Sequence, residues 1–187
     1  MNIKTWQTMK IGTSDLQMAD DFHMAFRAAD CKIDDRTRDM LNQPGFTVSA
    51  KRSKVELVKV SVAELGFLNE ATLVDIYASA MEQCLALCPP EVGPRLRLKY
   101  KNQPVGEWLQ IAMEPIIDSD GDLSVWELGH DDSGPRLQLK YSDGDGYVWK
   151  LRRAGYDHRL WLKGCCGRPG NPWRTDSQWV FIRCKAA

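Results

Sequence analysis

The sequence lacks the long apolar runs of a membrane protein. No stretch approaches the roughly 18 to 20 consecutive apolar residues of a transmembrane helix, and the N-terminal residues M-N-I-K-T-W-Q-T-M-K contain no apolar core of a signal peptide. We therefore expect a cytoplasmic protein without a membrane partner.

The chain also has no net charge, because its 25 basic residues are balanced by 25 acidic residues. Such a chain has no overall field to attract nucleic acid. The alternating bases Arg95, Arg97 and Lys99 are expected on the solvated face of a strand. We predict no nucleic-acid partner.

Motifs of the commonest nucleotide enzymes and hydrolases are absent. The chain has neither a P-loop nor a G-x-G-x-x-G fingerprint, and no serine lies in a nucleophile elbow. The acidic stretches 118–122 and 143–146 lack the Gly and Glu spacing of an EF-hand, so Asp-Gly hairpin turns are expected there. We expect no catalysis, no cofactor and no metal site.

The six cysteines are expected to be reduced, since no export signal accompanies them. Cys165 and Cys166 lie near Lys163 and Arg168, and positive charge favours a thiolate. One alternative is therefore a thiol-dependent enzyme in which His158 folds close to these cysteines. A second alternative is a structural interaction module that binds through its N-terminal helices.

The first half of the chain has helical signals around one strand. Apolar spacing predicts helices over about 15–29 and over 69–87, the latter capped by Asn69, and a short helix capped by Asp34. Residues 55–62 are rich in β-branched side chains and predict a strand. The polar stretch before it suggests a boundary near residue 50.

The second half is predicted to be β-rich, because short alternating segments are separated by Gly, Pro and Asp turns. Strands are expected at 95–100, 108–113, 123–128, 136–141, 147–151, 159–163 and 178–183. The segments G-P-R-L-R-L-K-Y at 93–100 and G-P-R-L-Q-L-K-Y at 134–141 are nearly identical. Both are expected to be strands with one buried face.

The C-terminal segment 159–183 combines two strand-like apolar ends with a middle that follows no helical or strand period. A rigid frame that presents an irregular loop is typical of a binding surface.

Several stretches resemble variable proteins of diversity-generating retroelements from uncultivated bacteria and archaea. They are V-S-V-A-E-L-G-F at 60–67, L-C-P-P-E-V-G-P-R-L-R-L-K-Y at 87–100, G-E-W-L-Q-I-A-M-E-P-I at 106–116 and W-V-F-I-R at 179–183. The resemblance implies a C-type-lectin-like domain whose C-terminal segment is diversified by adenine-directed mutagenesis to bind new ligands.

The resemblance also divides the segment into frame and changeable residues. Gly164, Gly167, Pro169, Trp173 and 179–181 match the frame. The implied ligand-binding residues are Lys163, Cys165, Cys166, Arg168, Gly170, Asn171, Arg174, Thr175, Asp176 and Ser177. All but Lys163 can be reached from an asparagine codon by changing adenines alone.

The sequence thus predicts an α+β protein with a small helical N-terminal segment, 1–50. A C-type-lectin-like ligand-binding domain, 51–187, follows it, with its variable region at about 159–183. The expected partner is a protein ligand.

Overall fold

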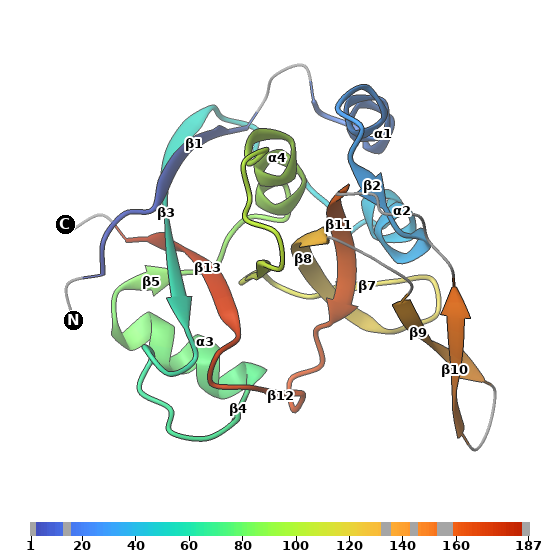
Figure 1. Cartoon of the computed structure of the whole chain (residues 1–187). Helices are drawn as coiled ribbons and strands as arrows, with labels where there is room; N and C mark the ends of the chain where they lie inside the picture. The colour runs from blue at the N-terminus through green and yellow to red at the C-terminus, as the bar shows by residue number, and fades with distance from the viewer. Residues whose placement is uncertain (1–2, 13–15, 132–135, 143–145, 153–158, 185–187) are drawn as a thin grey trace.

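The computed structural model describes residues 3–12, 16–131, 136–142, 146–152 and 159–184. It confirms a mixed α+β architecture, in which four helices pack around a nine-stranded sheet (Figure 1). No helix in these ranges is long and apolar enough to cross a membrane.

The main sheet has the strand order β1-β3-β13-β6-β8-β11-β2. These strands are β1 (Gln7–Ile11), β2 (Lys32–Ile33), β3 (Ser53–Ser61), β6 (Trp108–Ile111), β8 (Leu123–Asp131), β11 (Arg159–Cys166) and β13 (Gln178–Arg183). Neighbours are antiparallel except for β13 with β6 and β11 with β2, which are parallel. Two short strands extend it: β5 (Leu85–Ala86) pairs with β13, and β7 (Ile116–Ile117) pairs with β8.

Two smaller ladders lie outside this sheet. Strands β9 (Arg136–Ser142) and β10 (Gly146–Arg152) form an antiparallel pair, which projects from the rest of the molecule in Figure 1. Strands β4 (Ala71–Thr72) and β12 (Pro172–Trp173) form the other pair.

Helices cover both faces of the main sheet. On one face, α4 (Val92–Lys99) and α2 (Asp35–Asn42) contact β11, and Trp126 of β8 donates a hydrogen bond to the Pro90 carbonyl just before α4. On the other face, Tyr77 of α3 (Leu73–Glu82) packs edge-on against Trp179 and Phe181 of β13.

The N-terminal 50 residues share this core. Strand β1 pairs with β3, and β2 pairs with β11. Phe22 and Phe26 of α1 (Ala19–Ala28) are buried in the same hydrophobic cluster as Trp179. Residues on both sides of position 50 therefore stabilise one another.

The predicted helices exist, but two of them are shorter than expected. Helix α3 is capped by Thr72 rather than Asn69, and it ends at Glu82 because Cys84 has a positive φ of 58°. Helix α1 begins at Ala19, where the Asp21 carboxylate accepts the backbone N–H groups just before the helix. The short second helix and its Asp34 cap are confirmed, since this carboxylate accepts the Thr37 N–H.

The strand predicted at 95–100 is wrong, because this segment forms α4. Its near-copy, residues 136–142, forms strand β9 as predicted. In the first copy, tertiary packing outweighs the alternation of apolar and polar residues. Leu96 and Arg97 are both fully buried, and the Arg97 guanidinium donates hydrogen bonds to the Gln103 side chain and the Tyr100 carbonyl. Pro94 lies in the first turn, where a helix tolerates it.

Candidate functional site

The ten candidate binding residues lie on β11 and on the segment 167–177, which we call the variable loop. Lys163, Cys165 and Cys166 are on β11, and the other seven lie in the variable loop on either side of β12. Four of the ten are exposed: Arg168, Gly170, Arg174 and Asp176. The other six are partly exposed as residues, but the thiol of Cys165 is buried.

Gly164 and Gly167, which lie between them, pack against other side chains, whereas the frame residue Pro169 is exposed. A Cβ at Gly164 would lie 2.6 Å from Arg36 Cγ and 2.7 Å from Met40 Sδ, and a Cβ at Gly167 would lie 3.0 Å from Val125 Cγ1. Neither position has room for a larger side chain without movement of its neighbours. By contrast, a Cβ at Gly170 would meet nothing within 4 Å.

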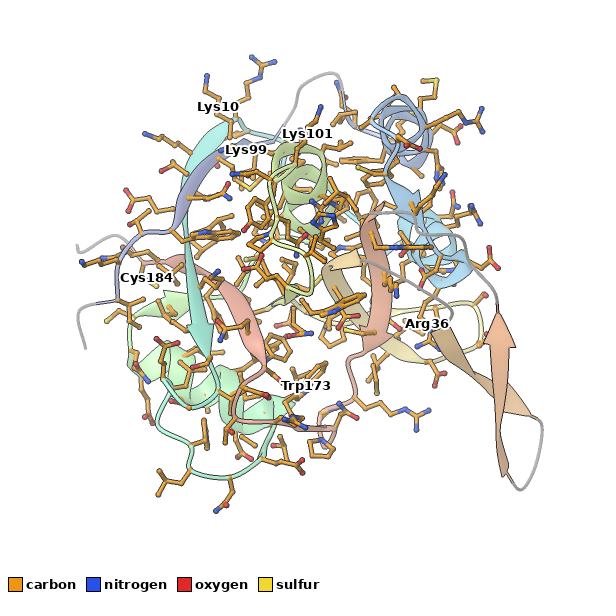
Figure 2. The ribbon with its side chains drawn as sticks, in the orientation of Figure 1. Lys10, Arg36, Lys99, Lys101, Trp173 and Cys184 are labelled. Carbon is orange, nitrogen blue, oxygen red and sulfur yellow. The ribbon has the colours of Figure 1, made fainter. Side chains whose placement is uncertain are left out.

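Trp173 anchors the middle of the variable loop. Its side chain is labelled in Figure 2. The ring packs edge-on against Trp179, with the two centroids 4.8 Å apart, and Trp179 is fully buried. Such aromatic pairs contribute beyond the area they bury. The loop is therefore fixed to the core at its centre.

Backbone hydrogen bonds fix the rest of the variable loop. The carbonyls of Thr175 and Ser177 accept the Ala63 and Val62 N–H groups at 2.9 and 3.1 Å. Gly167 N–H donates to the Leu123 carbonyl at 2.7 Å. A backbone held in this way presents its side chains with little entropy left to lose on binding.

Two exposed ion pairs set the charge of the loop. Arg174 binds Asp176 through two hydrogen bonds of 3.0 Å each, and this contact lowers the pKa of the Asp176 carboxyl. A hydrogen bond from Arg168 similarly lowers the pKa of Asp122. Exposed pairs are weak, so a ligand can replace either one at little cost.

Strand register extends this surface onto β8 and β6. Lys163 is opposite Glu127, and Glu127 is opposite Gln110, so the three side chains share one face of the sheet. Gln110 donates to Glu127 at 2.8 Å. Burial raises the pKa of the Glu127 carboxyl, and Gln110 and Lys163 offset only part of this effect.

Aromatic rings surround the Lys163 ammonium on that face. Its Nζ lies 4.6 Å from the Trp108 ring centroid and 5.1 Å from that of Trp161. Both rings are within the range of a cation–π interaction. Sequence reasoning did not include Trp108, Gln110 or Glu127 among the site residues. The sequence showed that side chains alternate along their strands, but it did not show the strand register that places these three residues beside β11.

The thiol of Cys165 lacks the environment of an activated nucleophile. Burial raises the pKa of Cys165 well above its ordinary value, and the nearby Glu127 carboxylate adds to this effect. Lys163 lies over two tryptophan rings, and Arg168 pairs with Asp122. His158, the proposed base, lies outside the described residues.

The acidic stretch 118–122 forms the predicted turn, here between β7 and β8. The Asp118 carboxylate accepts the N–H groups of Asp120 and Asp122, and Gly121 has a φ of 83°. The Asp118 carboxylate is thus used within the turn, whereas that of Asp122 pairs with Arg36 and Arg168. Residues 143–145 of the second acidic stretch lie outside the described residues.

Comparison with known proteins identifies no relative. No family model matches the chain, and neither a curated protein nor a solved structure is significantly similar to it.

Proposed function

We propose that this chain is a ligand-binding variable protein of the kind diversified by retroelements, with a C-type-lectin-like fold. Its ligand is a protein, bound by the surface formed by Lys163, Cys165, Cys166 and the variable loop. One observation carries the proposal: nine of the ten changeable positions, all but Cys165, are exposed or partly exposed, whereas Gly164, Gly167, Trp173 and Trp179 pack closely.

This division suits a surface whose residues change without loss of the fold. Substitutions at exposed positions usually alter the free energy of unfolding by less than about 0.5 kcal/mol. Substitution of the frame residues should lower the free energy of unfolding by more, because it would create steric overlap or a cavity in the core.

The chemistry of the surface favours a protein ligand. Asn171, Thr175 and Ser177 supply adaptable hydrogen-bonding groups, and Arg174 supplies a planar cation that is common in interfaces. The variable loop lies on a fixed backbone rather than in an enclosed pocket. A broad, adaptable surface recognises another protein better than it encloses a small molecule.

Two display libraries test the structural division. One library randomises the ten changeable positions, and the control library randomises Gly164, Gly167, Trp173 and Trp179. We expect most clones of the first library to reach the yeast surface folded, and selection against hen lysozyme to yield binders. The control library should largely fail to display. Equal failure of both libraries, or no binders from a well-displayed first library, would contradict the proposal.

The genetic part of the proposal has its own test. Deep sequencing of the gene in its native population should show variation concentrated at codons 163–177 and directed to template adenines. A reverse-transcriptase gene and an adenine-rich near-copy of the tail should lie nearby. Variation spread evenly along the gene would rule out diversification.

A further inference from the structure

A basic groove lies between β1, β3 and α4, away from the variable loop. Two adjoining hollows of about 560 and 490 Å³ share Lys10, Lys54 and Arg95 in their walls. In Figure 2, Lys10 and Lys99 lie at the top of the molecule, whereas Trp173 lies toward the bottom. The groove is therefore separate from the surface proposed above.

Cations from three distant parts of the sequence meet in this groove. Lys10 comes from β1, Arg52 and Lys54 from the start of β3, and Arg95 and Lys99 from successive turns of α4. Lys99 is held against β1 because its ammonium donates a hydrogen bond to the Thr8 carbonyl. The fold thus concentrates positive charge in a chain whose net charge is zero.

The strand register adds an unfavourable contact that an anion would relieve. Lys10 is directly opposite Lys54 in the β1–β3 ladder, and both side chains are exposed. Like charges directly opposite one another destabilise a strand pair. An anion between these two ammonium groups would turn the repulsion into attraction.

Two carboxylates lie near these lysines. Glu56 is opposite Thr8 in the β1–β3 ladder, on the same face as Lys10 and Lys54, and accepts a hydrogen bond from Thr5 Oγ1. Glu91 is fully buried; burial opposes its ionisation, but hydrogen bonds from the Gly12 and Ser49 N–H groups and from Arg95 outweigh burial and lower its pKa. Its negative charge is thus matched by Arg95, which it contacts directly. Lys10, Lys54 and Lys99 therefore outnumber Glu56, the exposed carboxylate beside them.

The groove also has an apolar wall, formed by Met9, Leu16 and Leu98. Its volume lies within the range of about 300 to 1,000 Å³ that is typical of small-molecule sites. Cations beside an apolar wall suit a ligand with a phosphate group at one end and an apolar or aromatic body at the other.

We propose that this groove binds a small phosphorylated ligand of nucleotide size. Lys10 and Lys54 contact the phosphate, Lys99 adds positive charge, and the body of the ligand packs on Met9, Leu16 and Leu98. This site is independent of the variable loop.

Calorimetric titration of the full chain tests the proposal with three probes: ADP, adenosine and inorganic pyrophosphate. We expect ADP to bind, and adenosine and pyrophosphate each to bind at least about tenfold more weakly, because each lacks one half of the ligand. The ADP affinity should fall as salt rises.

A matched pair of variants locates the site. Lys10→Gln with Lys54→Gln should weaken ADP binding roughly tenfold for each cation lost. Arg27→Gln with Arg38→Gln removes the same charge from exposed positions on α1 and α2, and should leave ADP binding unchanged. The first variant should melt no lower than the parent, because it removes a repulsive pair.

Three results would overturn the proposal. Absence of ADP and pyrophosphate binding up to about 1 mM would mean that the lysines only protect an exposed sheet edge. Equal binding of ADP and adenosine would show that the phosphate groups do not contribute to affinity. Equal loss of ADP affinity in both double variants would place the binding site elsewhere on the protein.

Discussion

Glycine-to-alanine substitution in the C-terminal segment separates frame from changeable residues with the smallest possible change. At Gly164 the added methyl group would lie 2.6 Å from Arg36 Cγ and 2.7 Å from Met40 Sδ. Carbon atoms in good contact are about 3.5 to 4.0 Å apart. The neighbours must therefore move by about 1 Å.

The cost depends on how freely those neighbours move. Met40 is fully buried, so its sulfur has no open space to enter. Arg36 is partly exposed and lies 3.6 Å from Asp118 and Asp122, and disturbing these pairs adds little. Overpacking a core costs about 1 to 3 kcal/mol, and we expect about 2 kcal/mol for Gly164→Ala.

For a chain of this length, that loss corresponds to a Tm lower by about 4 to 8 °C. Gly170→Ala is the control, because its methyl group would meet nothing within 4 Å. Its Tm should remain within about 2 °C of the parent. Thermal unfolding followed by circular dichroism measures both. A Gly164→Ala protein that melts with the parent, or a Gly170→Ala protein that loses as much, would refute the division into frame and changeable residues.

Three further substitutions or treatments test other parts of the structure. Because burial raises the pKa of Glu127 in the folded state, its contribution to stability should be complete at acidic pH and decline as pH rises through the folded pKa. In urea titrations, the free energy of unfolding of Glu127→Gln should therefore fall less with rising pH than that of the parent. An unchanged pH profile would contradict this. Arg174→Ala should alter the free energy of unfolding by less than about 0.5 kcal/mol, since its pair with Asp176 is exposed; a loss above about 2 kcal/mol in chemical denaturation would assign it to the frame. The thiol oxidant diamide should link Cys84 to Cys184, because both are exposed and Cys184 N–H donates to the Cys84 carbonyl at 3.0 Å. Peptide mapping without reductant detects the disulfide, and Cys84→Ser is the control. Absence of the disulfide would show that the two side chains point apart.

Local sequence signals identified most of the secondary structure. The Asp34 cap predicted α2, β-branched residues predicted β3, and an apolar run predicted β13, because these signals arise from contacts of each segment with its own neighbours. The turn at 118–122 followed from its Asp and Gly residues for the same reason.

Sequence alone could not decide between helix and strand for two nearly identical segments. Residues 93–100 and 134–141 share alternating Leu and basic residues, yet the first forms most of α4 and the second most of β9. A Cβ at Gly93 would lie 2.3 Å from Trp126 Cδ1, so α4 is packed closely onto β8. Gly93 and Trp126 are far apart in sequence, so no local sequence pattern predicts this contact.

The ten candidate binding positions were likewise chosen from sequence, through the resemblance, and they lie on β11 and in the variable loop. Their neighbours were not predictable: Glu127 and Gln110 join Lys163 only through the β6–β8–β11 register. The basic groove has the same origin, because Lys10, Lys54 and Lys99 meet only when β1, β3 and α4 pack together. Sequence determined most of the strands and the turn at 118–122, since short-range forces set these. Tertiary packing made a helix of the segment 93–100 and decided which charges and rings meet, since such contacts depend on the whole chain.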